Sequence, residues 1–230
     1  MARKAVVIGA GQGMGRAVAL KLAGNGTHVY LVGRTREKLE AVAEEIAGLS
    51  GSSSVYAADV SEKGALDGLQ AELTAGLDIL VNCAGEALMN SFDDTSFEDW
   101  QRILAVNLTS SYVATHALLP ALRKSENPSI VLVTSKVALR GYAVVAYSAA
   151  KAGVLGFARA LSVALREEGI RVVPLCPGPT DTPMRWAASP DMSRDLVISA
   201  ETIAETVWYL VNLPRGTSTG EILVQSELYD

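Results

Sequence analysis

The chain has 230 residues, which is enough for one large α/β domain or two small ones. Apolar residues make up 49% of it and charged residues 20%, and this balance excludes an intrinsically disordered or fibrous protein. The net charge of −5 comes from acidic and basic residues interspersed along the chain, so we expect no nucleic-acid partner and no membrane partner.

Short β-branched segments alternate with longer segments of helical period along the chain. The predicted strands cover residues 5–8, 28–32, 54–57, 78–82, 129–134, 170–175 and 221–224. The predicted helices cover residues 13–23, 35–47, 62–75, 97–123, 146–168 and 200–211. This alternation, with nearly continuous apolar strands, predicts a doubly wound parallel sheet of about seven strands. No linker divides the chain, so we expect a single α/β domain of Rossmann type over residues 1–230.

A glycine-rich turn, Gly9 to Gly15, follows the first predicted strand and precedes an Ala/Leu-rich helix. Glycines there allow a tight turn and close approach to a pyrophosphate, whose charge the free N–H groups of the helix attract. The spacing is G-x-x-x-G-x-G, because Met14 stands where the stricter G-x-G-x-x-G pattern needs glycine. The residues expected to bind a dinucleotide are Gly9, Gly11, Gln12, Gly13, Met14 and Gly15. A turn without ligand and an S-adenosylmethionine site are the alternatives.

The end of the second strand, Gly33-Arg34-Thr35-Arg36, indicates which dinucleotide binds. An NAD site favours an acidic residue here for the ribose 2′-hydroxyl, whereas an arginine accommodates a 2′-phosphate. No acidic residue is present, and the Arg34 guanidinium can form paired hydrogen bonds with a phosphate, with Thr35 or Arg36 as helpers. The sequence therefore favours NADP(H). The alternative is a solvated arginine at a helix start.

Three side chains capable of proton chemistry follow the fifth strand. Ser135 comes directly after it, and Tyr147 and Lys151 lie four residues apart at the start of the next helix, on one face. Tyrosine, with a pKa of about 10, is a weak base at neutral pH, and a nearby ammonium favours its phenolate. We therefore predict that Lys151 lowers the pKa of Tyr147, which acts as a general acid/base, and that Ser135 binds the substrate oxygen.

Together with these residues, several motifs in register resemble the short-chain dehydrogenase/reductase family from the first strand to about Thr182. They are Gly9-x-x-x-Gly13-x-Gly15, Asp59-Val60, Asn82-Cys83-Ala84-Gly85, Asn107, Ser135, Tyr147-x-x-x-Lys151 and Pro177-Gly178. The resemblance implies that Tyr147 is the proton donor and acceptor and that Lys151 also binds the nicotinamide ribose. It further implies that Ser135 orients the carbonyl and that Asn107 holds a water relaying protons to Lys151.

The same resemblance implies further residues at the cofactor. Asp59 is expected at the adenine, Asn82 and Gly85 along the cofactor, and Thr182 near the nicotinamide. The other expected cofactor-binding residues are Val60, Ala84, Pro177, Gly178 and Thr180. A weaker resemblance of the C-terminal segment is to the branch that acts on aldehydes, ketones and 3-hydroxy acids.

Three loops, at residues 86–91, 139–145 and 183–199, are expected to shape the substrate site, the last as the main substrate loop. Their apolar residues suit an apolar or aromatic carbonyl compound. These residues are Leu88, Met89, Leu139, Tyr142, Val144, Val145, Met184, Trp186 and Met192. In an alternative interpretation, Arg140 and Arg185 anchor a carboxylate.

The sequence thus predicts an NADP(H)-dependent oxidoreductase that interconverts a ketone or aldehyde and an alcohol by hydride transfer, with Tyr147 as general acid/base. Alternatives are a 3-oxoacyl thioester reductase and a non-catalytic nucleotide sensor or scaffold. Against the latter stands the complete set of Asn107, Ser135, Tyr147 and Lys151. The helix over residues 147–165 is apolar nearly all round, which predicts a homodimer or homotetramer.

Two cysteines, Cys83 and Cys176, lack C-x-x-C spacing and a nearby histidine. We therefore expect no disulfide framework and no metal site, and a reducing cytoplasm as the location. The apolar run after Lys4 ends within four residues, so no signal peptide is expected.

Overall fold

The computed structural model describes residues 2–229, whose strands form one parallel sheet in the order β3-β2-β1-β4-β5-β6-β7. The strands are β1 (Lys4–Ile8), β2 (His28–Gly33), β3 (Ser52–Ala57), β4 (Ile79–Asn82), β5 (Ser129–Val133), β6 (Arg171–Pro177) and β7 (Ile222–Val224). The helices are α1 (Gly13–Gly24), α2 (Arg36–Ile46), α3 (Asp67–Glu72), α4 (Phe97–Leu104), α5 (Ser110–Leu122), α6 (Val145–Ala164), α7 (Pro183–Ala188) and α8 (Ala200–Val211). The predicted single-sheet α/β fold is confirmed.

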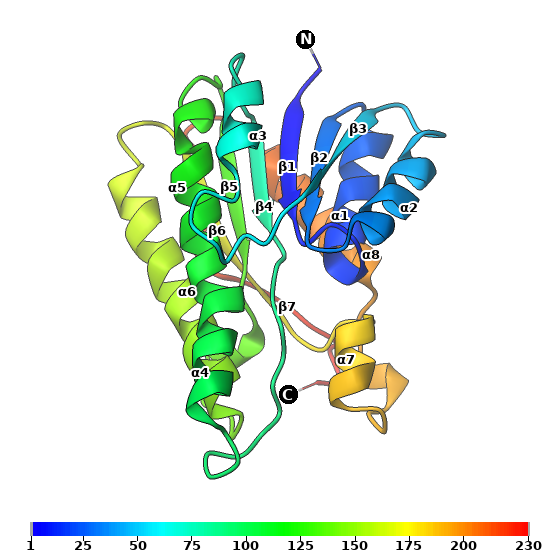
Figure 1. Ribbon diagram of the computed structural model, residues 1–230, viewed down its shortest axis with the longest axis vertical. Helices are drawn as coiled ribbons and strands as arrows, with labels where there is room; N and C mark the ends of the chain where they lie inside the picture. The colour runs from blue at the N-terminus through cyan, green and yellow to red at the C-terminus, as the bar shows by residue number, and fades with distance from the viewer. Residues whose placement is uncertain (1, 230) are drawn as a thin grey trace.

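Helices cover both faces of this sheet, with α1, α2 and α8 on one side and α3, α5 and α6 on the other (Figure 1). Each face has its own apolar core. Val7 and Leu31 belong to the core under α1, α2 and α8, whereas Val6 and Leu80 belong to the core on the opposite face. Burial on both faces explains why the strands are apolar almost without interruption.

The order of the strands places a crevice at β1. The chain builds β2 and β3 on one side of β1 and then crosses to β4 on the other, so the connections diverge at the carboxyl ends of β1 and β4. Ligands of doubly wound sheets bind at such a switch point. In Figure 1 the strands run downward, so their carboxyl ends face the lower half of the molecule, where α7 lies.

Two helices end earlier or begin later than the sequence suggests. The helix predicted over residues 62–75 is formed only at Asp67–Glu72, because Gly64 and Gly76 have φ values of +81° and +105°, which a helix does not contain. The helix predicted over residues 146–168 ends at Ala164, and turns lead from there to Gly169.

The long helix predicted over residues 97–123 is divided by a π-helical turn at Ala105–Thr109. A π-turn inserts one extra residue into the helix and is common at functional sites. Here it contains Asn107, whose side chain is buried and donates to the carbonyl of Ile103. The interruption therefore aims Asn107 away from the regular helical path.

The segment 183–199, expected as a loop, contains α7 and a short 3-10 turn at Arg194–Leu196. Thr182 begins α7 by accepting a hydrogen bond from the N–H of Arg185 at 3.2 Å, and Pro183 occupies the first turn. Among residues 2–229, no helix combines the length and apolar character that crossing a bilayer requires.

Candidate active site

The glycine turn after β1 has a backbone that larger residues would not fit. Gly9 has φ +79°, and a Cβ on it would lie 2.9 Å from the amide nitrogen of Ala84. A Cβ on Gly15 would lie 2.1 Å from the carbonyl oxygen of Gly9. Gln12 precedes the first turn of α1 without capping it through its side chain, so N–H groups there remain for a ligand. These features fit the pyrophosphate of a dinucleotide.

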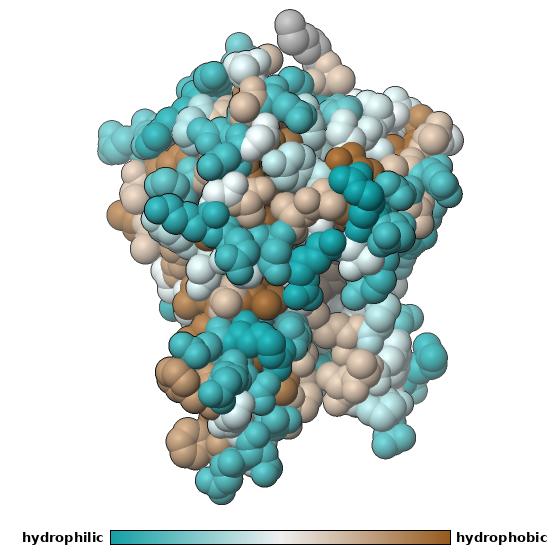
Figure 2. Space-filling model, viewed as in Figure 1, coloured by the Kyte–Doolittle hydropathy of each residue, from teal (hydrophilic) through white to brown (hydrophobic). Residues whose placement is uncertain are grey.

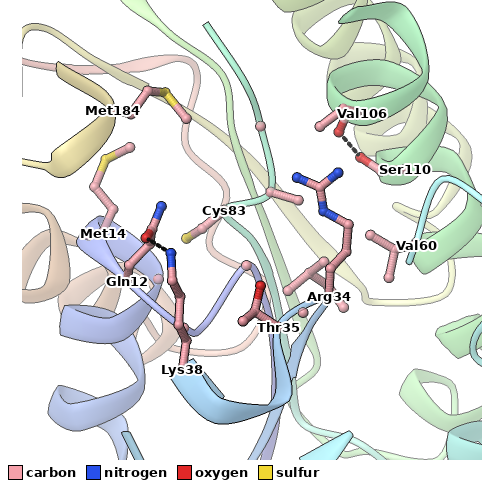
Figure 3. Close-up of a pocket in the computed structure, with 18 of the residues that line it drawn as sticks. Gln12, Met14, Arg34, Thr35, Lys38, Val60, Cys83, Val106, Ser110 and Met184 are labelled. Carbon is pink, nitrogen blue, oxygen red and sulfur yellow. Dashed lines mark hydrogen bonds between the residues drawn. The ribbon is translucent and has the colours of Figure 1, made fainter. Parts of the chain in front are cut away.

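A cavity extends from this turn along the carboxyl ends of β1, β2 and β4 (Figure 3). Most of the residues predicted to bind the cofactor line it. They are Gly9, Gly11, Gln12, Gly13, Met14, Gly15, Arg34, Thr35, Asp59, Val60, Ala84, Gly85 and Thr182. The spacing of the motifs therefore brings these segments, distant in the sequence, to one crevice.

A second cation, Lys38, lies beside Arg34 at this crevice and was missed by the sequence analysis. Both line the cavity, and Lys38 Nζ donates to Gln12 Oε1 at 2.8 Å (Figure 3). Lys38 lies in the first turn of α2, just after Arg34 at the end of β2, and a lysine so close to the end of that strand is the signal that could have found it.

The carboxylate of Asp59 faces the same cavity. Its Oδ1 accepts hydrogen bonds from the Ser61 backbone at 3.0 Å and the Ser61 hydroxyl at 2.7 Å. Burial favours a higher pKa for Asp59, but these bonds and the charge of Arg34 outweigh it and lower the pKa. Asp59 therefore remains an anionic hydrogen-bond acceptor at neutral pH.

Several residues predicted to bind the cofactor do not line this cavity, Lys151 among them. Asn82 is buried outside the cavity: its amide donates to Ser111 Oγ at 3.0 Å and its Oδ1 accepts from the N–H of Ala84 at 3.0 Å. It positions the loop after β4, because buried polar groups must be paired. Pro177, Gly178 and Thr180 line a neighbouring cavity.

This neighbouring cavity, the substrate-side cavity, is lined by Ser135 and Tyr147. It adjoins the first cavity, since Met14, Thr182 and Met184 line both. A molecule beside the serine and tyrosine would therefore lie next to one bound in the crevice.

The pKa of Tyr147 differs from the expectation. Burial raises it above its ordinary value, while a hydrogen bond with Ser135 and the positive charge of Arg185 act in the opposite direction without reversing the shift. Lys151 Nζ lies 5.8 Å from the centre of the Tyr147 ring. The net shift is therefore upward, and a lowering of this pKa by Lys151 stays a prediction, since Lys151 is not among the causes of the shift.

Lys151 is buried and donates to the carbonyl of Val133 at 3.1 Å. Burial lowers the pKa of Lys151 to about 8, although the Cys83 thiol favours the charged form. Burial also raises the pKa of Cys83 to about 12, so this thiol is neutral at physiological pH.

Gly85 leaves room for the side chains of both Asn107 and Lys151. A Cβ on Gly85 would lie 2.8 Å from Asn107 Oδ1 and 3.2 Å from Lys151 Nζ. Asn107 Nδ2 donates to the carbonyls of Glu86 at 3.0 Å and Ile103 at 2.9 Å, so its amide is held firmly. The water relay through Asn107 stays a prediction.

The whole arrangement has a counterpart among known proteins. A family model described as short chain dehydrogenase matches residues 3–193. The chain belongs to the short-chain dehydrogenase family. An uncharacterised oxidoreductase of Staphylococcus aureus strain N315 is 32% identical over 228 residues, covering 96% of both chains. The chain is thus an oxidoreductase of this family.

Two solved short-chain dehydrogenase/reductase structures share the fold and differ in cofactor. A short chain dehydrogenase from Mycobacterium paratuberculosis bound to NAD is 26% identical, with a TM-score of 0.87, over 97% of this chain and 96% of that chain. An actinorhodin polyketide ketoreductase variant with NADPH is also 26% identical, with a TM-score of 0.88, over 99% and 97%. The choice between NAD and NADP must therefore be argued from this chain's own residues.

For this short-chain dehydrogenase, the structure also shows which of the residues expected at the substrate site line the substrate-side cavity. Five of the nine expected apolar residues line the substrate-side cavity: Met89, Tyr142, Val144, Met184 and Met192. The other four do not line it: Leu88, Leu139, Val145 and Trp186. Arg185 lines it as well, whereas Arg140 is exposed outside it. The segment 183–199 thus contributes to the cavity through α7 and the residues that follow.

Proposed function

We propose that the protein is an NADP(H)-dependent oxidoreductase that interconverts a ketone or aldehyde and an alcohol. One observation carries the reaction: the Ser135 and Tyr147 hydroxyls line a cavity that adjoins the glycine-turn crevice. A carbonyl between these hydroxyls would lie beside the nicotinamide end of a dinucleotide in the crevice.

The preference for NADP(H) is supported by the cations at the end of β2. Arg34 and Lys38 line the crevice there, where no acidic residue follows Gly33 to bind a ribose 2′-hydroxyl. A guanidinium and an ammonium are the groups that bind a 2′-phosphate. Calorimetric titration should give NADPH the lower Kd, and a Kd for NADH as low as that for NADPH contradicts the preference.

Side chains of the protein carry out the proton chemistry that accompanies hydride transfer. When bound, the dinucleotide supplies or accepts a hydride at its nicotinamide. Tyr147, which like any tyrosine is protonated at neutral pH, donates the proton to the carbonyl oxygen during reduction, and Ser135 orients that oxygen by a hydrogen bond. Lys151 supplies positive charge behind Tyr147, where a phenolate forms after the proton leaves.

A panel of ketones, aldehydes and 3-oxoacyl thioesters, with NADPH consumption as the readout, tests this proposal. We expect turnover of free carbonyl compounds, and no turnover by Tyr147→Phe, whose Kd for NADPH should stay within about threefold of wild type, since only the proton donor is lost. Thioesters as the sole substrates would favour the acyl-thioester alternative. Tight NADPH binding without any turnover would favour a sensor.

Self-association and location complete the proposal. Tyr112 on α5 and Val163 on α6 are 53% and 66% exposed, and apolar atoms are visible on the α5 and α6 side of the molecule (Figure 2). Such a surface is typical of a homodimer or homotetramer, and light scattering that finds a monomer at micromolar concentration would contradict this proposal.

The free thiols of Cys83 and Cys176 support a cytoplasmic location.

A further inference from the structure

Two cationic side chains in the substrate-side cavity have no part in the proton chemistry described above. Lys136 directly follows Ser135, and Arg185 projects from α7; both line the cavity. No aspartate or glutamate is among the cavity-lining residues within the described part of the chain, although the protein carries a net charge of −5. The cavity is therefore cationic in an acidic protein.

Lys136 is 3% exposed, which is rare for a lysine without a strong partner. Within residues 2–229 its ammonium donates to the carbonyl of Tyr229 at a long 3.4 Å and lies 4.4 Å from the centre of the Tyr229 ring. An ammonium has three donors, and burying its charge is costly unless an anion compensates. The site therefore favours an anion beside Lys136.

Arg185 faces the same space. It lines one cavity together with Tyr147 and Tyr229, and its charge opposes the burial that raises the pKa of both phenols. Its side-chain hydrogen bond within the described chain goes from Nη1 to the sulfur of Met192 at 3.8 Å, and a thioether is a weak acceptor. The paired N–H groups that a carboxylate accepts from are thus available in the cavity.

We propose that Lys136 and Arg185 bind a carboxylate of the substrate, so that the protein acts on small oxo acids and the corresponding hydroxy acids. This inference rests on the proposed carbonyl–alcohol function and adds the substrate class. The carbonyl lies at Ser135 and Tyr147, and the carboxylate lies toward the C-terminal segment, where Tyr229 forms part of the wall. The cavity of about 300 Å³ is at the small end of ligand sites, which suits a short acid.

Kinetics on matched pairs test the inference. Each linear 2-, 3-, 4- and 5-oxo acid is compared with its methyl ester, which removes the charge, with NADPH and with NADH. The wild type should prefer at least one acid over its ester by about tenfold or more in kcat/KM. Lys136→Gln and Arg185→Gln should each lower kcat/KM for that acid by about 10- to 100-fold, the effect of losing one charged hydrogen bond, and should lower kcat/KM for the ester at least about tenfold less.

Two further variants control for structural effects. Arg194→Gln removes an arginine of the same segment that packs 4.7 Å from the Trp186 ring and does not line the cavity, so acid and ester kinetics should stay at the wild-type values. Arg185→Lys keeps a positive charge and should recover part of the acid activity. Thermal melting of Lys136→Gln establishes that the variant is folded.

Three outcomes would overturn the inference. Wild-type turnover of esters at least as fast as acids leaves the proposed function standing and removes the carboxylate site. Equal losses on acid and ester in both variants would mean that the two cations only hold the C-terminal segment. Absence of turnover of every pair with both cofactors removes the inference, and the proposed function falls with it only if the ketones and aldehydes of the panel are not turned over either.

Discussion

Replacing Lys151 by methionine should stabilise the fold at neutral pH while it abolishes turnover. Lys151 is 5% exposed, and burial lowers its pKa from 10.5 to about 8. The unfolded chain therefore binds this proton more tightly than the folded protein, and the ammonium destabilises the fold at pH 7 by about 3 kcal/mol.

The sign and the pH window follow from the same two values. Between pH 8 and pH 10.5 the unfolded chain holds more protons at Lys151, so the wild type gains stability as the pH rises through this window. The penalty falls from about 3 kcal/mol at pH 7 to about 1.4 kcal/mol at pH 9.5. The hydrogen bond to Val133 that the variant also loses adds an offset that does not vary with pH.

Urea unfolding of both proteins at pH 7 and pH 9.5 measures this effect. The free energy of unfolding of Lys151→Met, relative to wild type, should decrease by about 2 kcal/mol between the two pH values. Thr134→Val is the control, because the buried Thr134 hydroxyl donates to the carbonyl of Lys151 at 2.8 Å and does not titrate. A Lys151→Met difference as independent of pH as that of the control would refute the lowered pKa.

Three further substitutions test separate parts of the structure. Arg34→Ala should raise the Kd for NADPH about 10- to 100-fold and leave the Kd for NADH within about threefold, measured by calorimetry; equal losses would contradict the phosphate role. Gly85→Ala puts a Cβ 2.8 Å from Asn107 Oδ1 and 3.2 Å from Lys151 Nζ, so these side chains must shift and kcat should fall about tenfold or more. An unchanged kcat would show that turnover does not depend on their present positions. Arg171→Met removes five hydrogen bonds of a guanidinium that is 6% exposed, and urea unfolding should show a loss of about 2–4 kcal/mol; a loss under about 1 kcal/mol would mean that water replaces it.

The sheet could be predicted from local pattern because its strands are buried on both faces. Every predicted strand is present, and the observed ends lie within about two residues of the predicted ones. The ends of the helices were harder to predict than the strands, because a single residue can decide where a helix begins or ends. Gly64 and Gly76 shorten α3 through positive φ values, and the π-turn at Asn107 depends on a side chain that bonds to distant backbone.

The part of the site that depends on the spacing of motifs along the sequence could be predicted. The glycine turn, Arg34 and Asp59 share one crevice because each directly follows a strand. Spacing does not give the depth of a side chain or its direction. Asn82 also follows a strand but turns into the protein interior, and Lys38 lies in a helix yet reaches the crevice.

The chemistry of the tyrosine shows the same limit. Helical spacing correctly places Lys151 near Tyr147. The pKa, however, depends on how much water each group loses and on which partner each selects, and Lys151 bonds to the carbonyl of Val133. Burial therefore raises the pKa of Tyr147 in this structure, which makes the phenol a weaker acid.

Isotope transfer tests the central claim most directly. The protein is incubated with a carbonyl substrate and NADPH that carries deuterium at the transferable C4 position, and the alcohol is analysed by mass spectrometry. Hydride transfer with proton donation by Tyr147 predicts one deuterium at the carbinol carbon of the wild-type product and no alcohol from Tyr147→Phe. An unlabelled alcohol, or labelled alcohol formed equally fast by the phenylalanine variant, would contradict the account.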